Sequence, residues 1–210
     1  MKKELEKVEN LYSDNIRKHG VSSKSVGWNT KKCQNLRFEI LLSKISKNDS
    51  FTMNDLGCGY GALIDYMTEF NFICSNYTGI DISEKMISKA LALHSKNDHI
   101  SFLQSDHISE IADYSVASGI FNVRFESSKE KWEKHILDTL TNLNTYSKIG
   151  FSFNLLTSYV DYKEPHLYYG DPCFFFDYCK KNFSKKVTLI HDYPLWEWTI
   201  TVLKDASNSV

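Results

Sequence analysis

Three glycines at alternate positions, Gly57, Gly59 and Gly61, follow an acidic residue, Asp55, in the stretch NDLGCGYGALIDYM. Glycine has no Cβ, so a loop of this composition lets a ligand lie directly against the backbone. A dinucleotide-binding loop has the spacing G-x-G-x-x-G and a P-loop has G-x-x-x-x-G-K-[ST], and this stretch has neither. The carboxylate of Asp55 disfavours a pyrophosphate here and suits a ligand that carries positive charge.

A second acidic residue, Asp81 in YTGIDIS, comes twenty residues after Gly61 at the predicted end of the next strand. A carboxylate at the end of that strand can accept hydrogen bonds from both hydroxyls of a ribose. Together, the glycine loop and Asp81 predict a ligand with a ribose and a cationic end that has no phosphate.

These stretches resemble the motifs of the class I S-adenosylmethionine-dependent methyltransferases. DLGCGYG is similar to the first motif of that family, and GIDIS, followed by Met86 and Ala90, is similar to the second. QSDH, at the end of the next predicted strand, resembles the segment that contacts the adenine. The resemblance covers roughly Phe51 to Asn122 and implies S-adenosyl-L-methionine as the cofactor and S-adenosyl-L-homocysteine as the product.

The resemblance also implies roles for individual residues. The glycine loop surrounds the methionine part of the cofactor, Asp81 holds the ribose, Ile82 packs on the adenine, and Asp106 accepts from the adenine amino group. The full set of cofactor-binding residues expected is Asp55, Gly57, Cys58, Gly59, Gly61, Asp81, Ile82, Ser105, Asp106, His107 and Asn122, with Trp28 and Arg37 from the N-terminal part.

The elements that must position these residues follow from apolar periodicity. Strand-like runs, FTMNDL, YTGIDI, ISFLQS, SVASGIFN and KIGFSFNLL, alternate with helical segments, which predicts a parallel sheet with helices on both faces. The last two runs, KVTLIHDY and EWTITVLK, are separated by a connection too short for a helix and should pair antiparallel. With the resemblance, this predicts an α/β Rossmann-like sheet of seven mostly parallel strands with an antiparallel last strand.

Helix starts are marked by capping residues. Ser83 is expected to cap the helix that follows the second strand, and Ser127 with Glu130 fits a capping box. Asp171 followed by Pro172 predicts an N-cap with proline at the first helical position. Apolar periodicity predicts two earlier amphipathic helices, one carrying Leu5, Val8, Tyr12 and Ile16 and the next Leu36, Ile40, Leu41 and Ile45. By the resemblance, they form an N-terminal helical cap over residues 1–48.

The acceptor site is expected beyond the carboxyl ends of the strands. Asn122 is expected to end the fourth strand, and Val123-Arg124-Phe125 departs from the N/D-P-P-Y motif of enzymes that methylate base amines or glutamine amides. The tyrosine-rich segment at about 154–172 predicts a substrate lid. Catalytic candidates are Asn122, Tyr168 and, as general base, His166, although a histidine in a loop is also compatible with a surface position.

The stretch HGVSSKSVGWNTKKCQNLRFE also resembles the N-terminal segment of some small bacterial methyltransferases. By that resemblance Trp28 caps the cofactor or acceptor, and Arg37 pairs with the cofactor's carboxylate. A core position for Trp28 and an exposed helix position for Arg37 are the alternatives.

The bulk properties narrow the class of partner. With 210 residues, the chain predicts one domain over 1–210, comprising the cap and an α/β core over 49–210. The net charge of −1 and the lack of a basic block disfavour a nucleic acid or a membrane, the cysteine spacing suggests no metal site, and a cytoplasmic location is expected. We therefore predict methyl transfer to O or N of a small molecule. RNA or protein methylation and a non-catalytic cofactor-binding subunit are the alternatives, and the oligomeric state is left open.

Overall fold

The structure is a computed structural model that describes residues 2–27, 30–94 and 96–205. Its helices are α1 (Lys2–His19), η1 (Ser23–Val26), α2 (Lys31–Leu41), α3 (Ala62–Glu69), α4 (Glu84–His94), α5 (Lys129–Thr145) and α6 (Pro172–Asn182). Its strands are β1 (Phe51–Leu56), β2 (Cys74–Asp81), β3 (Ile100–Gln104), β4 (Ala112–Ala117), β5 (Ser147–Leu156), β6 (Lys186–Ile190) and β7 (Glu197–Leu203).

The strands form one seven-stranded sheet in the order β3-β2-β1-β4-β5-β7-β6. The pairs from β3 to β5 are parallel, and β7 runs antiparallel to both β5 and β6. The expected Rossmann-like sheet with a reversed last strand is confirmed. The order changes direction between β1 and β4, and in such sheets a ligand binds at the carboxyl ends of the strands on either side of this point.

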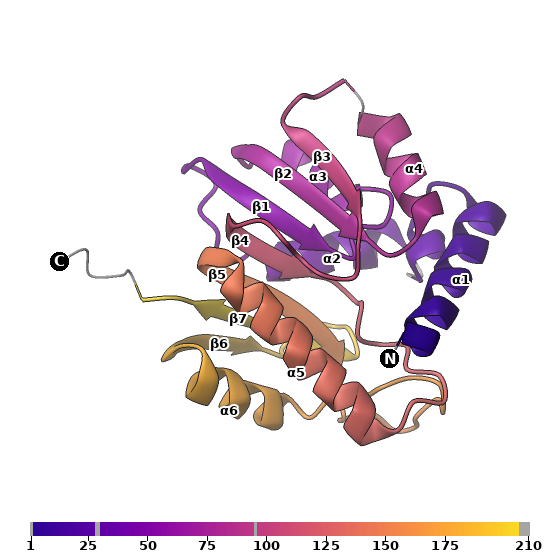
Figure 1. The fold of residues 1–210 in the computed structure, drawn as a ribbon. Coiled ribbons are helices and arrows are strands. Elements are labelled where there is room, and N and C mark those ends of the chain that lie inside the picture. Colours follow the sequence, from indigo (N-terminus) through magenta and orange to yellow (C-terminus); the bar gives the residue numbers. More distant parts are fainter. Residues whose placement is uncertain (1, 28–29, 95, 206–210) are drawn as a thin grey trace.

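Helices cover both faces of the sheet (Figure 1). On one face, α5 and α6 pack on a core that includes Trp132, Phe153, Phe175 and Trp198, all fully buried. On the other face, α2 and α3 bury Phe38, Leu41 and Leu63 against β1 and β2. This packing holds the carboxyl ends of β1, β2 and β4 in a fixed arrangement.

The N-terminal helices were predicted, but the buried face of α2 was not fully anticipated. α1 lies beside α4, and α2 packs against α3 and β7. The buried side chains of α2 are Gln34, Arg37, Phe38 and Leu41, at the i, i+3, i+4, i+7 spacing of one helix face. The apolar pattern predicted only Leu41 of these four. It missed Gln34 and Arg37 because they are polar, and it assigned Leu36 and Ile40, which are only partly buried, to the face in place of Phe38.

Two predicted boundaries are wrong. The fourth strand ends at Ala117, so Asn122 does not end it; Gly119, with φ of 73°, turns the chain before that residue. The N-cap of α5 is Ser128, whose hydroxyl accepts from Lys131 N at 3.3 Å, and not Ser127. The other start signals are confirmed: Asp171 caps α6 ahead of Pro172.

Within the described residues, no helix is both long and apolar enough to cross a membrane.

Candidate functional site

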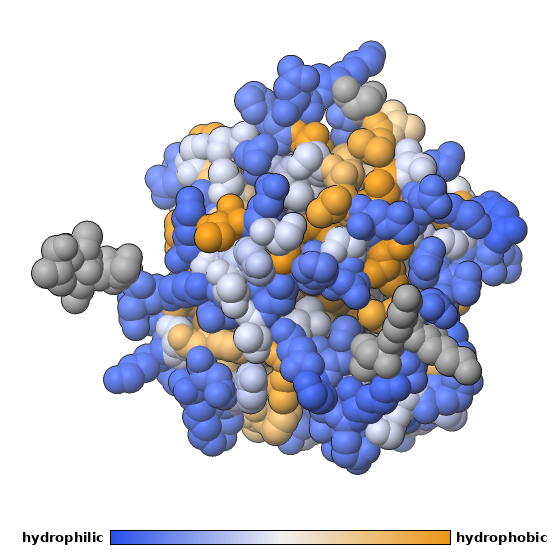
Figure 2. Space-filling model, in the orientation of Figure 1, coloured by the Kyte–Doolittle hydropathy of each residue, from blue (hydrophilic) through white to orange (hydrophobic). Residues whose placement is uncertain are grey.

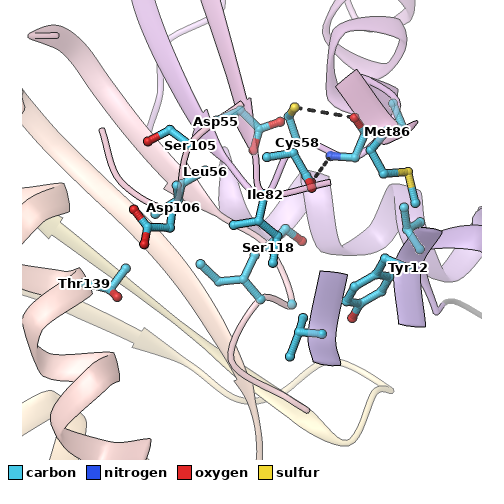
Figure 3. A pocket seen from close by; sticks show the side chains of 18 of the residues that line it. Tyr12, Asp55, Leu56, Cys58, Ile82, Met86, Ser105, Asp106, Ser118 and Thr139 are labelled. Carbon is cyan, nitrogen blue, oxygen red and sulfur yellow. Dashed lines mark hydrogen bonds between the residues drawn. The ribbon is translucent and has the colours of Figure 1, made fainter. Parts of the chain in front are cut away.

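A cavity opens at the carboxyl ends of β1, β2 and β4, where the sheet order changes direction. The space between its walls, including the open solvent at its mouth, is about 1010 Å³. The glycine loop forms its floor, and α1 lies across it on one side, with α5 on the other (Figure 3). Figure 2 shows apolar atoms gathered in this hollow with hydrophilic side chains around them.

The glycine loop has the backbone that its composition predicts. Gly57, Gly59 and Gly61 have φ of 81°, 56° and 87°, values that side chains with a Cβ rarely adopt. A Cβ on Gly57 would lie 2.0 Å from Cγ2 of Ile120, in the loop after β4. Gly57 and Gly59 line the cavity, whereas Gly61 lies outside its lining at the start of α3.

Asp81 lies at the centre of the site. Its Oδ2 accepts from Gly59 N at 2.9 Å, and its Oδ1 accepts from Ser83 N at 2.8 Å. Burial raises the pKa of Asp81 to about 6, although these hydrogen bonds act in the opposite direction. The carboxylate therefore links the glycine loop to the start of α4, and each of its oxygens can accept a further hydrogen bond.

Asp55 is buried at the end of β1, and its Oδ2 accepts from the Tyr77 hydroxyl at 2.6 Å. Burial raises the pKa of Asp55 to about 7, and the nearby charge of Asp81 contributes to the shift. Cys58 is also buried, and burial raises the pKa of its thiol well above the ordinary value. The thiol is thus protonated near neutral pH, which makes Cys58 a packing residue and not a nucleophile.

The segment after β3 supplies the other end of the cavity. Ser105 and Asp106 line it together with Ile82, as expected. Ser105 N donates to Asp81 O at 3.0 Å, so this segment is tied to the end of β2. His107 lies outside the lining, and its Nδ1 lies 2.7 Å from Asp106 Oδ1.

Several lining residues were missed at the sequence level. Ser118, Gly119 and Ile120 follow β4 directly, in a stretch assigned to the strand itself. Others come from helices, among them Tyr12 from α1, Gln34 and Phe38 from α2, and His135 and Thr139 from α5. The spacing of His135 and Thr139 places them on one face of α5, but nothing local indicates that this face borders a ligand site.

The three catalytic candidates are not among the residues that line the cavity. Asn122 is buried; its Oδ1 accepts from Leu156 N at 3.2 Å, and its backbone carbonyl accepts from Tyr168 N at 2.8 Å. The Tyr168 hydroxyl donates to Glu133 Oε1 at 2.8 Å, and burial raises its pKa. His166 is exposed. In this structure Asn122 and Tyr168 have structural contacts that hold the 154–172 segment to the body of the protein.

Arg124 also holds this segment. Its Nε donates to Leu167 O at 3.2 Å and its Nη2 to Pro165 O at 3.1 Å, while its Nη1 binds Ser127 O. Arg124 therefore ties the 154–172 segment to the start of α5 through backbone carbonyls.

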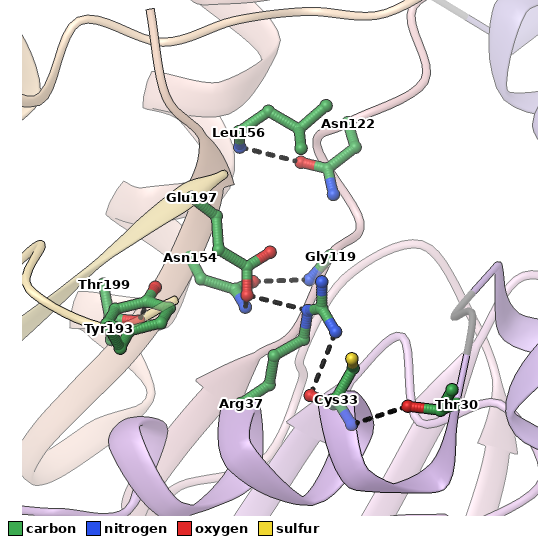
Figure 4. A network of polar contacts seen from close by, with 10 residues as sticks. All are labelled: Thr30, Cys33, Arg37, Gly119, Asn122, Asn154, Leu156, Tyr193, Glu197 and Thr199. Atoms are coloured by element: carbon green, nitrogen blue, oxygen red, sulfur yellow. Dashed lines mark hydrogen bonds and ion pairs between the residues drawn. The ribbon is translucent and has the colours of Figure 1, made fainter. Parts of the chain in front are cut away.

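Arg37 is engaged in a buried network at the carboxyl end of β5 (Figure 4). Its Nε lies 2.7 Å from Oε1 of Glu197, the first residue of β7, and its Nη1 donates to Cys33 O at 3.0 Å. Arg37 is not among the residues that line the cavity, so pairing with a cofactor carboxylate would require this ion pair to open. The other N-terminal candidate, Trp28, lies outside the described residues.

Comparisons with known proteins agree with this geometry. A family model described as "Methyltransferase domain" matches residues 54–125. A Mycobacterium tuberculosis protein named "Putative methyltransferase Rv1506c" is 49% identical over 162 residues, which are 76% of this chain and 97% of that protein. The chain belongs to the class I S-adenosylmethionine-dependent methyltransferases.

Solved methyltransferases share the fold at low sequence identity. Phosphoethanolamine N-methyltransferase 1 of Haemonchus contortus, in complex with phosphoethanolamine and S-adenosylhomocysteine, has a TM-score of 0.67 at 12% identity; the match covers 98% of this chain and 49% of that chain. The N-methyltransferase NodS from Bradyrhizobium japonicum, in complex with S-adenosylhomocysteine, has a TM-score of 0.58 at 12% identity and covers 93% and 98%. This methyltransferase thus spans about half of the first and nearly all of the second.

The cavity fits the cofactor that the family uses, S-adenosyl-L-methionine. A glycine-rich loop lies beside the buried carboxylate of Asp55 and the partly buried carboxylate of Asp81, and these two acceptors suit a ribose and a cation better than a phosphate. Within the described residues, no group of histidine, cysteine or acidic side chains is arranged to hold a metal ion.

Proposed function

We propose that this methyltransferase transfers a methyl group to an oxygen or nitrogen atom of a small molecule, and that it does so in the cytoplasm. The observation that carries the proposal is the covered cavity: side chains of α1 and α2 line the same cavity as Gly57 and Gly59 of the glycine loop, with Tyr12 of α1 at its edge (Figure 3). A cover of this kind leaves room for a compact acceptor and hinders a large one. The net charge of −1 also offers no general attraction for a polyanion.

We assign the cofactor contacts from the geometry and the family resemblance together. Asp81 binds the ribose hydroxyls, Gly57 and Gly59 allow close approach of the methionine part, and Asp55 adds negative charge beside it. Ile82 packs on the adenine, and Asp106 accepts from its amino group. When bound, the cofactor supplies an activated methyl group on a sulfonium, so the protein has mainly to orient the acceptor and exclude water.

Helices α1 and α2 help to exclude water from the cavity. Leu5, Val8 and Phe38 give the cavity an apolar wall, which limits access of water to the reacting atoms. The Haemonchus contortus neighbour is in complex with a small molecule, phosphoethanolamine, and with S-adenosylhomocysteine. This similarity concerns the fold and does not identify the acceptor of this chain.

The experiment is transfer of label from S-adenosylmethionine carrying a tritiated methyl group. Wild-type protein is incubated in parallel with a small-molecule extract of bacterial cells, with total RNA and with a protein fraction. The proposal predicts labelled product in the small-molecule extract only. Label in RNA or protein would replace it with macromolecular methylation, and cofactor binding without any labelled product would favour a non-catalytic subunit.

A further inference from the structure

Glu197 has one carboxylate oxygen that no described residue satisfies. The side chain is fully buried at the start of β7. Its Oε1 lies 2.7 Å from Arg37 Nε and 3.5 Å from Asn154 Nδ2. Its Oε2 is buried and has no hydrogen-bond partner in the part of the chain that the structure describes. A buried carboxylate oxygen without a donor is costly, so such an atom calls for a donor from outside the protein.

The location of this oxygen relates it to the methyltransferase site. Asn154 Oδ1 accepts from Gly119 N at 2.7 Å, and Gly119 lines the cavity. Gln34 and Phe38, which flank Arg37 on α2, line it as well. Figure 4 shows the second oxygen of Glu197 turned away from Arg37, on the side of the network where Gly119 and Asn122 lie. Glu197 itself is not among the residues that line the cavity. Its oxygen lies behind the stretch of wall that Gly119 contributes, at the carboxyl end of β5, so an acceptor reaches it only when that stretch moves aside.

The charges of Arg37 and Glu197 indicate which kind of hydrogen-bond donor can bind to Oε2 of Glu197. Arg37 already offsets the negative charge of Glu197, and both side chains are buried. An ammonium group bound here would add a positive charge that no further buried carboxylate of the network offsets. A neutral hydroxyl group adds none and supplies the O–H that Oε2 can accept.

We propose that Glu197 binds the methyl acceptor, its Oε2 accepting a hydrogen bond from a neutral hydroxyl group of that molecule. This inference rests on the proposed function, since it assigns a residue and a substrate class to the same site. Arg37 and Asn154 act as positioning residues: Arg37 holds Oε1, and Asn154 joins the carboxylate to the Gly119 segment of the cavity wall.

The experiment uses the small molecule that wild-type protein labels in the tritiated-methyl assay. In Glu197→Gln, the side-chain carbonyl still accepts from Arg37, but an NH₂ group replaces the oxygen that accepts from the hydroxyl group. In Glu197→Asp, the negative charge remains, but the carboxylate is one methylene further from the hydroxyl group. Both variants are expected to raise KM for the acceptor about tenfold or more, with S-adenosylhomocysteine affinity within about twofold of wild type. Asp177→Asn, at an exposed position on α6, is the matched control and should change neither.

A test without any variant guards against misfolding. A set of analogues of the labelled acceptor is prepared, each with one hydroxyl group replaced by hydrogen, and each is assayed with wild-type protein. One of these analogues should have a KM raised as much as the KM of the natural acceptor is raised in the Glu197 variants. Unchanged KM in both Glu197 variants, or an acceptor with no hydroxyl group, would overturn the inference alone. Absence of any labelled small molecule from protein that binds S-adenosylhomocysteine would overturn the proposed function and the inference with it.

Discussion

At the scale of single residues, Asp81 carries most of the proposed cofactor recognition. Replacing Asp81 by alanine removes the proposed acceptor for the ribose hydroxyls and frees Gly59 N from its partner. We expect the affinity for S-adenosylhomocysteine to fall by about 1–3 kcal/mol, measured by calorimetry. Asp65→Ala, at an exposed position on α3, should leave the affinity unchanged. Equal affinity in both variants would count against the ribose contact.

The need for glycine at position 57 can be tested by comparison with Gly20, which also has a positive φ but has no neighbouring atoms where a Cβ would lie. Gly57→Ala places a Cβ 2.0 Å from Ile120, whereas Gly20, with φ of 62°, has no atom within 4 Å of the added Cβ. We expect Gly57→Ala to lower the free energy of unfolding by about 1–3 kcal/mol more than Gly20→Ala, as measured by urea unfolding. Ile120→Ala added to Gly57→Ala should recover part of the loss; no recovery would mean that crowding by Ile120 is not the cause.

Asp55 should make stability depend on pH. Its pKa is raised to about 7 in the folded protein, while an unfolded chain releases this proton near pH 4. Between these values the folded state binds more protons, so the free energy of unfolding attributable to Asp55 falls as pH rises from about 4 to about 7. In Asp55→Asn this contribution is absent, and urea unfolding at about pH 5 and pH 7 should show a smaller decrease than in wild type. An identical decrease would show that Asp55 is not the titrating group.

At the scale of elements, the N-cap of α5 could not be predicted from the local sequence alone. Ser127 and Ser128 are adjacent candidates for the N-cap, and only the backbone turn at Arg124 and Phe125 decides between them. The Ser128 hydroxyl accepts from Lys131 N, whereas the buried Ser127 Oγ has no partner among the described residues. Ser128→Ala should cost about 1 kcal/mol of unfolding free energy, and Ser127→Ala less; the reverse order would restore Ser127 as the cap.

The 154–172 segment is predicted to depend on Arg124 for its order. Arg124 binds the carbonyls of Pro165 and Leu167, and replacing it by alanine removes these contacts. We expect faster protease cleavage within 158–167 in Arg124→Ala, with S-adenosylhomocysteine affinity unchanged because no residue of the segment lines the cavity. Cleavage at the wild-type rate would contradict this role.

At the scale of the whole molecule, the features that could be predicted from the sequence are those determined by residues close together in the chain. The glycine loop, Asp81 and the Asp171 cap are local patterns, and strand alternation with a short last connection, together with the family resemblance, predicted the sheet. The Arg37–Glu197 pair, the contribution of α5 and the cover formed by α1 depend on residues far apart in the chain. Polar residues on buried faces, such as Gln34 and Arg37, give no apolar periodicity by which to find them.

The central claim is that this cavity holds the cofactor of the class I methyltransferases and not a phosphate-bearing nucleotide. The most direct measurement is a calorimetric titration of the purified protein with S-adenosylhomocysteine, with NAD and ATP as comparators under the same conditions. The carboxylates of Asp55, which is buried, and Asp81, which is partly buried, predict binding of S-adenosylhomocysteine and none of NAD or ATP. Binding of NAD or ATP in preference to S-adenosylhomocysteine, or no binding of any of the three, would contradict the account.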